Sequence, residues 1–597
     1  LVFTVTNGYS LYLGALSELT NMYYGDGKGV GHIIYVNRNY VDFNTRQQLT
    51  YKKTFKDIHN FDIMLGHDFR NQEQGTVQAA KSDMLKADDL QLSNAVRAIA
   101  TVGSKTDYRS ENYMGELRYN FDEKYFAIIN GSVFGSSYFA PGHQYGTFAS
   151  AGASWNIHKE TFMADVKKWL SNLKVKASFG TSGNDNIGNY NYLDLYSMSN
   201  FNGLPAVLWN AIAERSLTWE TSYKFNAGVE FEIKKGRLYG EFEVYNNYVV
   251  NSLDTREIAP SIGYTEVPIN DGKYRSFGAE LLLKAQVIKS RNFDLNFRLT
   301  AAHYDAVFVE LPKERINGKW LEMIMNGSYA KGVSRGAIYT KKYEGVDPET
   351  GWGRWAAYKN ENGTSTDTSY IPEPYKYLRQ RTVDNNGKVV DLHKNATLTP
   401  FMTNDYRKAA YEYVEGKSRY PDIYGGFGID VSTYGFDISM AFNYIIGGYN
   451  FDAIYASLMS DRSMGANNYH VDMLHAWSRF RPEENSTTNV PLLLAGLYDQ
   501  IDANKVYYAD WTGNRSTRFL TSNTGLQLSS VRIAYNFPKK MLEKIQIKSM
   551  SVWIMGDNLM VLSARRGYNP FTYMTGGNSS SQYAPLSTIV GGLKFSF

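Results

Sequence analysis

Histidine and acidic side chains gather in one polar segment of the chain, where they could hold a metal ion. His470, Asp472 and His475 fall within six residues of one another. Zinc sites combine ligand pairs at characteristic spacings, and this segment lacks that pattern. His59 and His67 share one face of an expected strand, but at about 3.3 Å per residue they lie too far apart to bind one ion. We therefore predict no metal centre here.

Two further segments could bind ions through carboxylates or through a glycine-rich backbone. Residues 347–351 read Asp-Pro-Glu-Thr-Gly, which offers carboxylates to calcium but also has the composition of a tight turn. Residues 183–188 begin and end with glycine, but they do not join a strand to a helix as phosphate-binding loops do. We expect turns at both places and no cofactor, with a structural calcium ion at the first as the alternative.

Tryptophans outside the regular strand pattern are the better candidates for contacting a ligand. Their apolar rings with a polar edge can stack on sugar rings or hold peptide side chains. The alternative is that they pack inside folded loops or lie at a membrane interface. The candidates are Trp209, Trp352, Trp355, Trp477 and Trp511.

Strands must position these loops, because apolar and polar residues alternate along much of the chain. A period of two gives a strand one apolar and one polar face. The clearest hairpin runs from Thr221 to Val244 and reverses at Lys234-Lys235-Gly236, where glycine suits a tight turn. We count roughly 16 to 18 such segments, many of them longer than the 9–11 residues that cross a bilayer. Other clear examples are 279–285, 293–301, 436–444 and 531–535.

The last strand shows the same alternation up to the terminal carboxylate. Its apolar face carries Ile589, Leu593, Phe595 and Phe597. An outer-membrane β-barrel commonly ends in this way, because its last strand closes the wall and faces lipid. We therefore predict that this strand closes a barrel.

The connections alternate between short turns and long loops. Short turns lie at 121–124, 234–236 and 434–435, and the longest loops run roughly from Asp347 to Tyr420 and from Phe451 to Ser522. Outer-membrane barrels have short periplasmic turns and long extracellular loops, whereas loops this long do not suit a soluble β-sandwich. Between Glu310 and Tyr420 we find one good strand where two crossings are required, so one strand is either missed or misassigned.

The composition agrees with a membrane barrel and excludes a membrane-spanning helix. The chain of 597 residues is 43% hydrophobic and 15% aromatic, with 47 tyrosines and no cysteine. No stretch approaches roughly 18 uninterrupted apolar residues. The net charge of +4 is small for this length and points to no polyanionic partner such as nucleic acid. Catalysis needs a nucleophile with a base, or paired acids, and we find neither, so we predict no enzyme.

Five motif groups together resemble the SusC/RagA family of TonB-dependent outer-membrane transporters from Bacteroidetes. Their order and spacing match the C-terminal two thirds of that family, although Asn569 stands where the family usually has an acidic residue. The groups lie at 117–155, 173–190, 345–351, 420–439 and 556–570.

The resemblance implies an all-β fold: a large antiparallel transmembrane barrel, 22-stranded in the family, with long extracellular loops. Residues 1–597 would form the C-terminal part of this barrel and contain most of its strands. The N-terminal plug and pre-plug domains of the family have no counterpart in the sequence.

The resemblance also implies the function: import of oligosaccharides or peptides across the bacterial outer membrane. The implied partners are a SusD-like surface lipoprotein and, through the N-terminal part, the TonB complex. The alternatives are a plug-free diffusion channel or a secretion-linked barrel. A third possibility, an outer-membrane protease or lipase, would need catalytic groups that we do not find in the sequence.

Overall fold

The alternating segments form long antiparallel strands in the computed structural model. The structure describes residues 1–258, 263, 266–316, 319–322, 325–326, 328–360, 381–383, 388–391, 398–406, 408–459, 468–492, 516–543, 546–572 and 585–596. Within these ranges, sixteen strands belong to one sheet, which agrees with the predicted number and fold class. The chain divides into two compact units: 1–160, 174–227 and 247–273 form the first, and 161–173, 228–246 and 274–597 form the second.

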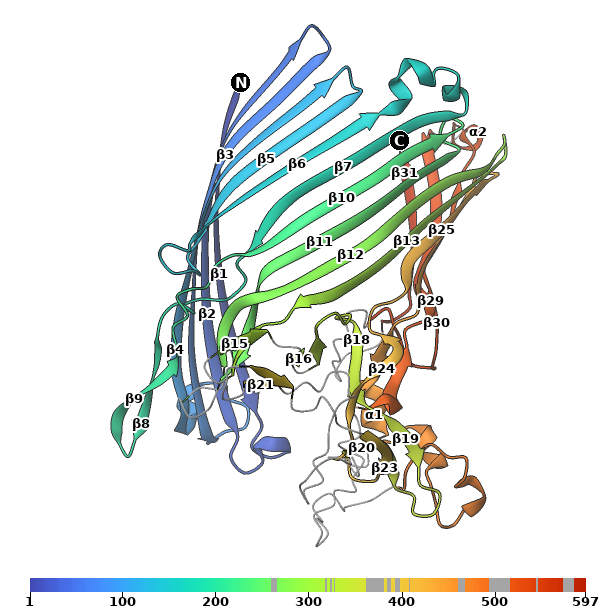
Figure 1. The fold of residues 1–597 in the computed structure, drawn as a ribbon. Coiled ribbons are helices and arrows are strands. Elements are labelled where there is room, and N and C mark those ends of the chain that lie inside the picture. Colours follow the sequence, from blue (N-terminus) through green and yellow to red (C-terminus); the bar gives the residue numbers. More distant parts are fainter. Residues whose placement is uncertain are drawn as a thin grey trace. The chain divides into compact units, whose positions relative to one another are not determined.

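The long strands of the first unit lie side by side in chain order (Figure 1). They are β1 (Val2–Thr20), β2 (His32–Phe55), β3 (His59–Met84), β4 (Ala95–Phe121), β5 (Tyr125–Ser136), β6 (Tyr145–Asn156) and β7 (Leu170–Asn184). The connection after β7 carries a separate hairpin of β8 (Leu195–Phe201) and β9 (Leu204–Ala211). The next strands in the sheet order are β10 (Glu220–Ile233), β11 (Leu238–Glu257) and β12 (Glu266–Lys289).

One face of the first unit carries an apolar band, as the alternation predicts, with the pairs His67–Glu111 and Lys105–Glu73 beyond it, and further ion pairs lie along the other face. Leu65 on β3 is 57% exposed and Ile129 on β5 is 56% exposed, both on the apolar face. On the polar face, cross-strand pairs join β2 to β3: Arg46–Asp68 at 2.6 Å, Lys52–Asp62 at 2.9 Å and Arg70–Asp42 at 2.7 Å. Opposite charges on facing strand positions stabilise the pairing register.

The predicted short turns are confirmed by their backbone angles. Asp122 and Glu123 between β4 and β5 have φ values of 50° and 51°, and Tyr434 and Gly435 have φ values of 47° and 91°. Two successive residues with positive φ make the turn whose twist matches that of the flanking strands. Lys234, Lys235 and Gly236 also have positive φ, at 51°, 55° and 90°.

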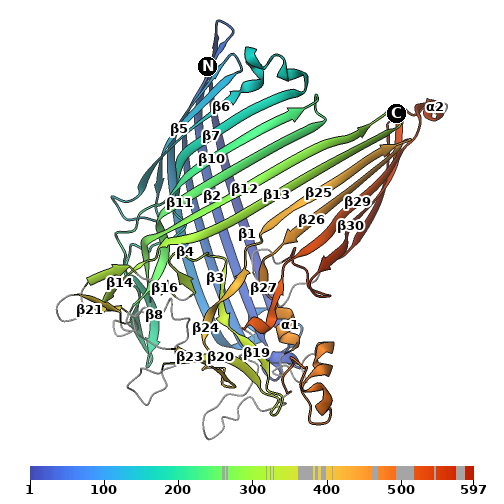
Figure 2. The ribbon, with the colours of Figure 1, turned by 45° about the vertical axis from the view of Figure 1, so that its right-hand side comes forward.

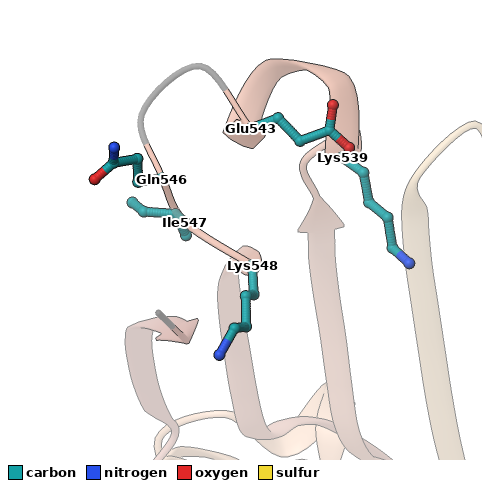
Figure 3. A pocket seen from close by; sticks show the side chains of 5 residues that line it. All are labelled: Lys539, Glu543, Gln546, Ile547 and Lys548. Carbon is teal, nitrogen blue, oxygen red and sulfur yellow. The ribbon is translucent and has the colours of Figure 1, made fainter.

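The long strands of the second unit follow one another in the sheet as β13, β25, β26, β29, β30 and β31 (Figure 2). Their bounds are β13 (Phe293–Glu310), β25 (Ile423–Thr433), β26 (Phe436–Ile446), β29 (Gly525–Asn536), β30 (Ser549–Ser563) and β31 (Thr588–Ser596). Because β13 pairs directly with β25, the described residues between these two strands add no strand to the large sheet. The strand predicted to cross between Glu310 and Tyr420 was therefore misassigned.

Short strands fold this loop and the loop after β26 into small separate sheets. The two-stranded sheets pair β14 (Lys313–Ile316) with β15 (Lys319–Glu322), β16 (Met325–Asn326) with β17 (Tyr329–Ala330), β18 (Ala337–Lys341) with β24 (Tyr411–Ser418), β21 (Arg381–Val383) with β22 (Val389–Asp391), and β27 (Tyr449–Phe451) with β28 (Leu520–Ser522). A three-stranded sheet holds β19 (Tyr343–Val346), β20 (Gly353–Asn360) and β23 (Leu398–Thr403).

The helices are short and lie in the connections. The α-helices are α1 (Ala453–Leu458) and α2 (Lys539–Leu542), and single 3-10 turns include 25–27, 92–94, 157–159, 161–163, 166–168, 471–475, 482–484 and 517–519. Within the described ranges, no helix is both long enough and apolar enough to cross a bilayer. In the second unit, α2 lies at the short-turn end of the long strands, and α1 and the small sheets gather at the other end (Figures 1 and 2).

Candidate functional site

An aromatic core holds the long loop of the second unit together. Trp355 on β20 is 1% exposed and packs edge-on against Tyr343 and Tyr406, with ring centres 5.9 and 5.5 Å away. Trp477 comes from the loop after β26 and joins the same cluster at 6% exposure. This loop core, residues 343, 346, 355, 406, 409 and 477, ties together the loops on either side of the β25–β26 hairpin.

The acidic turn at 347–351 is built around Trp477. Its backbone closes through hydrogen bonds from Gly351 N to Asp347 O and from Asp347 N to Trp352 O, each 2.8 Å long. The Trp477 indole donates to Pro348 O at 2.9 Å. Gly351 has a φ of 79°, and a side chain there would meet the Trp477 ring at 2.6 Å. The expected turn is confirmed, and its glycine is required by both conformation and space.

The structure separates the five candidate tryptophans. Trp355 and Trp477 are buried in the loop core, so packing is the role that the structure gives these two. Trp209 is 51% exposed on β9 and stacks on Tyr196 at 6.5 Å, so its contact with a ligand stays a prediction. Trp352 is partly exposed in the acidic turn. Trp511 lies outside the described residues.

A buried lysine on β18 lies beside the loop core. Lys341 is 5% exposed, and its ammonium donates to Tyr406 O at 2.6 Å. The same ammonium lies 3.9 and 4.9 Å from the ring centres of Tyr406 and Tyr411. Burial lowers the pKa of Lys341 to about 8, against the opposing effect of the nearby Asp405 carboxylate. The folded loop therefore contains a lysine whose pKa lies well below the ordinary value for lysine.

Loop stability should rise with pH between about 8 and 10.5, because an unfolded Lys341 still holds a proton that the folded loop has released. The expected gain is about 3 kcal/mol across this window. Lys341→Met should flatten the dependence, while Lys331→Met, at an exposed lysine paired with Glu322, should leave it unchanged. Urea unfolding followed by tryptophan fluorescence at several pH values measures this. Equal slopes in the wild type and Lys341→Met would contradict the assignment.

The histidine-rich segment forms a local polar cluster. Asp472 accepts a hydrogen bond from Tyr455 Oη at 2.6 Å and lies 3.3 Å from His470 Nδ1. Burial raises the pKa of Tyr455 to about 12, and the Arg565 guanidinium lies 4.1 Å from its ring centre. His475 lies at the end of the same 3-10 turn. Among the described residues, no three His, Cys, Asp or Glu side chains are placed to hold a metal ion together.

Tyrosines gather on the polar face of the second unit, near the loop end of its strands. We call Tyr245, Tyr304, Tyr420 and Tyr424 the tyrosine wall. Tyr304 on β13 packs edge-on against Tyr420 at 5.0 Å, and the hydroxyl of Tyr245 on β11 lies over Gly278 on β12. Tyr424 on β25 pairs with Ala302 on β13. Ala302 precedes Tyr304 by two residues, so the side chains of Ala302 and Tyr304 lie on the same face of β13.

Arginine and acidic groups border the tyrosine wall. The Arg335 guanidinium lies 4.4 Å from the ring centre of Tyr274 and 5.0 Å from that of Phe308. The neighbouring Ser334 hydroxyl donates to Asp305 at 2.6 Å. Aromatic faces with adjacent charged and hydroxyl groups suit polar organic ligands with apolar patches, such as sugars and peptide side chains.

Sequence reasoning missed this wall although a signal was present. Tyr304 continues the polar face of its strand, alternating with the apolar residues 293–301. A tyrosine at a polar-face position is a candidate for ligand contact, whereas a loop tryptophan has no strand period to show which way it points.

Both the sequence and the fold of this chain are similar to those of known proteins. Residues 2–358 match the family described as TonB dependent receptor-like, beta-barrel. The TonB-dependent receptor P3 of Formosa agariphila is 23% identical over 590 residues, which are 96% of this chain and 53% of that protein. The TonB-dependent receptor SusC of Bacteroides thetaiotaomicron is 28% identical over 219 residues, 34% of this chain and 22% of that protein.

Among solved structures, a chain of the RagAB peptide transporter is similar with a TM-score of 0.75 and 20% identity, covering 100% of this chain and 60% of that one. At this identity the likeness concerns the fold. The chain spans about half the length of the curated relatives it matches over nearly its whole extent.

Proposed function

Because this chain belongs to the TonB dependent receptor-like β-barrel family, we propose that it forms the wall and outer loops of an energy-driven nutrient importer. TonB-dependent receptors are outer-membrane transport barrels and not enzymes, so the chain lies in the bacterial outer membrane. This function is proposed for the whole protein. The chain described here matches 53% of the length of the P3 relative.

The cargo that we propose is an oligosaccharide or a peptide. The tyrosine wall carries the proposal, because it offers several rings on the polar face close to the loop end of the strands. Ring stacking suits both sugars and peptide side chains, and Trp209 on its exposed hairpin adds a further ring. The similar solved structure is titled a peptide transporter, which favours the peptide class.

The partners that we propose are a SusD-like surface lipoprotein over the loops and the TonB complex on the periplasmic side. The similarity to SusC and to a chain of the RagAB transporter supports this assignment. Co-purification of a lipoprotein with the full-length protein from its host membranes is the expected result.

Uptake of a labelled peptide or oligosaccharide by cells tests the import itself. Cells that carry the full-length protein should accumulate the cargo, and a protonophore that removes the energy source should abolish accumulation. A diffusion channel would instead equilibrate the cargo regardless of the protonophore, and that result would refute energy-driven import.

Within the site, Tyr304→Ala together with Tyr424→Ala should lower the affinity for cargo about tenfold, because two ring contacts are lost. The matched control is Tyr434→Ala, at a tyrosine 77% exposed in a short turn. Cargo binding to the purified protein, measured by calorimetry, gives the affinities. Equal affinity in both variants would remove the tyrosine wall from the site.

A further inference from the structure

The apolar face of the first unit shows where the bilayer begins and ends. Tyr125 and Trp155 face each other next to the short turns, and Tyr113 and Tyr145 lie at the opposite end of the apolar band. About ten residues of strand separate these aromatic rows, which is the length that crosses the hydrocarbon core of a membrane. Because short turns are periplasmic, the row at Tyr125 marks the periplasmic leaflet.

A groove of about 510 Å³ opens on this face just above the periplasmic row. Its floor is Ala127, Ala153 and Ala177, which face one another across β5, β6 and β7. All three alanines are exposed, so the groove is open to the membrane side. Tyr119 on β4 and Val175 on β7 are among the side chains that line it.

The periplasmic end of the groove is closed by a braced aromatic pair. The Tyr125 and Trp155 rings are stacked with centres 6.1 Å apart. One carboxylate holds both, because Glu160 Oε1 accepts from Tyr125 Oη at 2.6 Å and from Trp155 Nε1 at 3.0 Å. The polar edges of both rings therefore meet one carboxylate, and the stacked pair lines this end of the groove.

Paired charges border this closed end. Lys124 lies 3.0 Å from Asp122, and Lys159 pairs with Glu123. Two lysines and three carboxylates, Glu160 among them, therefore lie at this end. Such a mixture of charges complements a zwitterionic head group better than a strongly anionic one.

The geometry points to a bound phospholipid whose acyl chain fills the groove and whose zwitterionic head group lies at the Glu160 rim. The groove opens into the hydrocarbon layer, where acyl chains are the solvent, and an unfilled groove would forfeit dispersion contacts along its floor and walls. Its position in the periplasmic leaflet favours phospholipid over lipopolysaccharide, whose chains occupy the opposite leaflet.

Quenching of Trp155 by brominated phosphatidylethanolamine tests the site in the detergent-solubilised full-length protein. The Trp155 signal is the difference between the wild type and Trp155→Phe at each lipid concentration. It should saturate at low lipid concentration, whereas the remaining tryptophans should be quenched in proportion to the lipid added.

Filling the groove should weaken this binding. Ala153→Leu should raise the lipid concentration for half-quenching roughly fivefold or more, since the leucine occupies the floor. Ala177→Leu should do the same from the neighbouring strand. The matched control, Ala149→Leu, places the same side chain on the same strand and face four residues away, outside the groove lining, and should change nothing.

Three outcomes would overturn the proposal. The first is quenching of Trp155 that rises in proportion to lipid concentration without saturating, and to the same extent in Ala153→Leu and Ala149→Leu. The second is displacement of the brominated lipid by lipopolysaccharide, which would place the site in the other leaflet. The third is protection of Trp155 that grows with protein concentration, which would mean that a second copy of the chain covers the groove.

Discussion

Gly425→Ala should prevent most of the protein from reaching its folded state, because no room exists for the added methyl group. A Cβ atom at Gly425 on β25 would lie 2.0 Å from the Thr300 carbonyl oxygen on β13 and 3.0 Å from the Tyr444 hydroxyl on β26. That hydroxyl donates to the same carbonyl at 2.8 Å. Since backbone atoms cannot move aside without breaking the β13–β25 pairing, we expect a loss of about 3 kcal/mol or more.

Gly131→Ala is the matched control for this prediction. Gly131 also lies inside a long strand, but nothing stands within 4 Å of the position of its missing Cβ. This variant should fold as well as the wild type or be slightly more stable, by about 0.5 kcal/mol. The fraction of heat-modifiable, folded protein on gels after refolding into detergent measures both. Similar behaviour of the two variants would show that β13 and β25 do not meet at Gly425.

Trp355→Ala should unfold the loop core while leaving the barrel strands intact. Removing a fully buried indole typically costs about 3–5 kcal/mol. Here it would leave a cavity between Tyr343 and Tyr406. Limited proteolysis of the purified protein should cut the 343–410 segment rapidly in this variant, whereas heat modifiability should persist.

Two controls separate packing from ligand contact. Trp355→Phe should be nearly as resistant to protease as the wild type, because Trp355 Nε1 is buried without a hydrogen-bond partner in the described structure and the ring is what matters. Trp209→Ala, at the exposed β9 hairpin, should leave protease resistance unchanged and affect only cargo binding. If Trp355→Ala resisted protease like Trp209→Ala, the loop core would not depend on this ring.

The strands and short turns could be predicted because their signals are local. The alternation from Thr221 to Ile233 indicates which face of the strand is apolar. Lys235-Gly236, directly after the strand, indicates the turn that reverses the chain. The register then follows, because a shift by one residue would exchange the two faces.

The loops could not be predicted in the same way, because their partners are distant in sequence. Nothing near Trp355 indicates that Trp477 will join its cluster, or that Asn489 will accept a hydrogen bond from Tyr343. Trp355 and Trp477 are buried in the loop core, because long loops need cores of their own, and the ligand contact expected of them stays a prediction. The closing role expected for Ile589, Leu593 and Phe595 stays a prediction: they are exposed on β31, whose described partner is β30, and Phe597 lies outside the described residues.

The direct pairing of β13 with β25 makes the intervening segment an inserted module with respect to the wall. The entropic cost of joining the ends of such an insertion grows only with the logarithm of its length. Selection can therefore lengthen, shorten or exchange residues 311–422 with little thermodynamic penalty for the strands that carry them. The segment can therefore diversify in sequence and length while the pairing of β13 with β25 is kept.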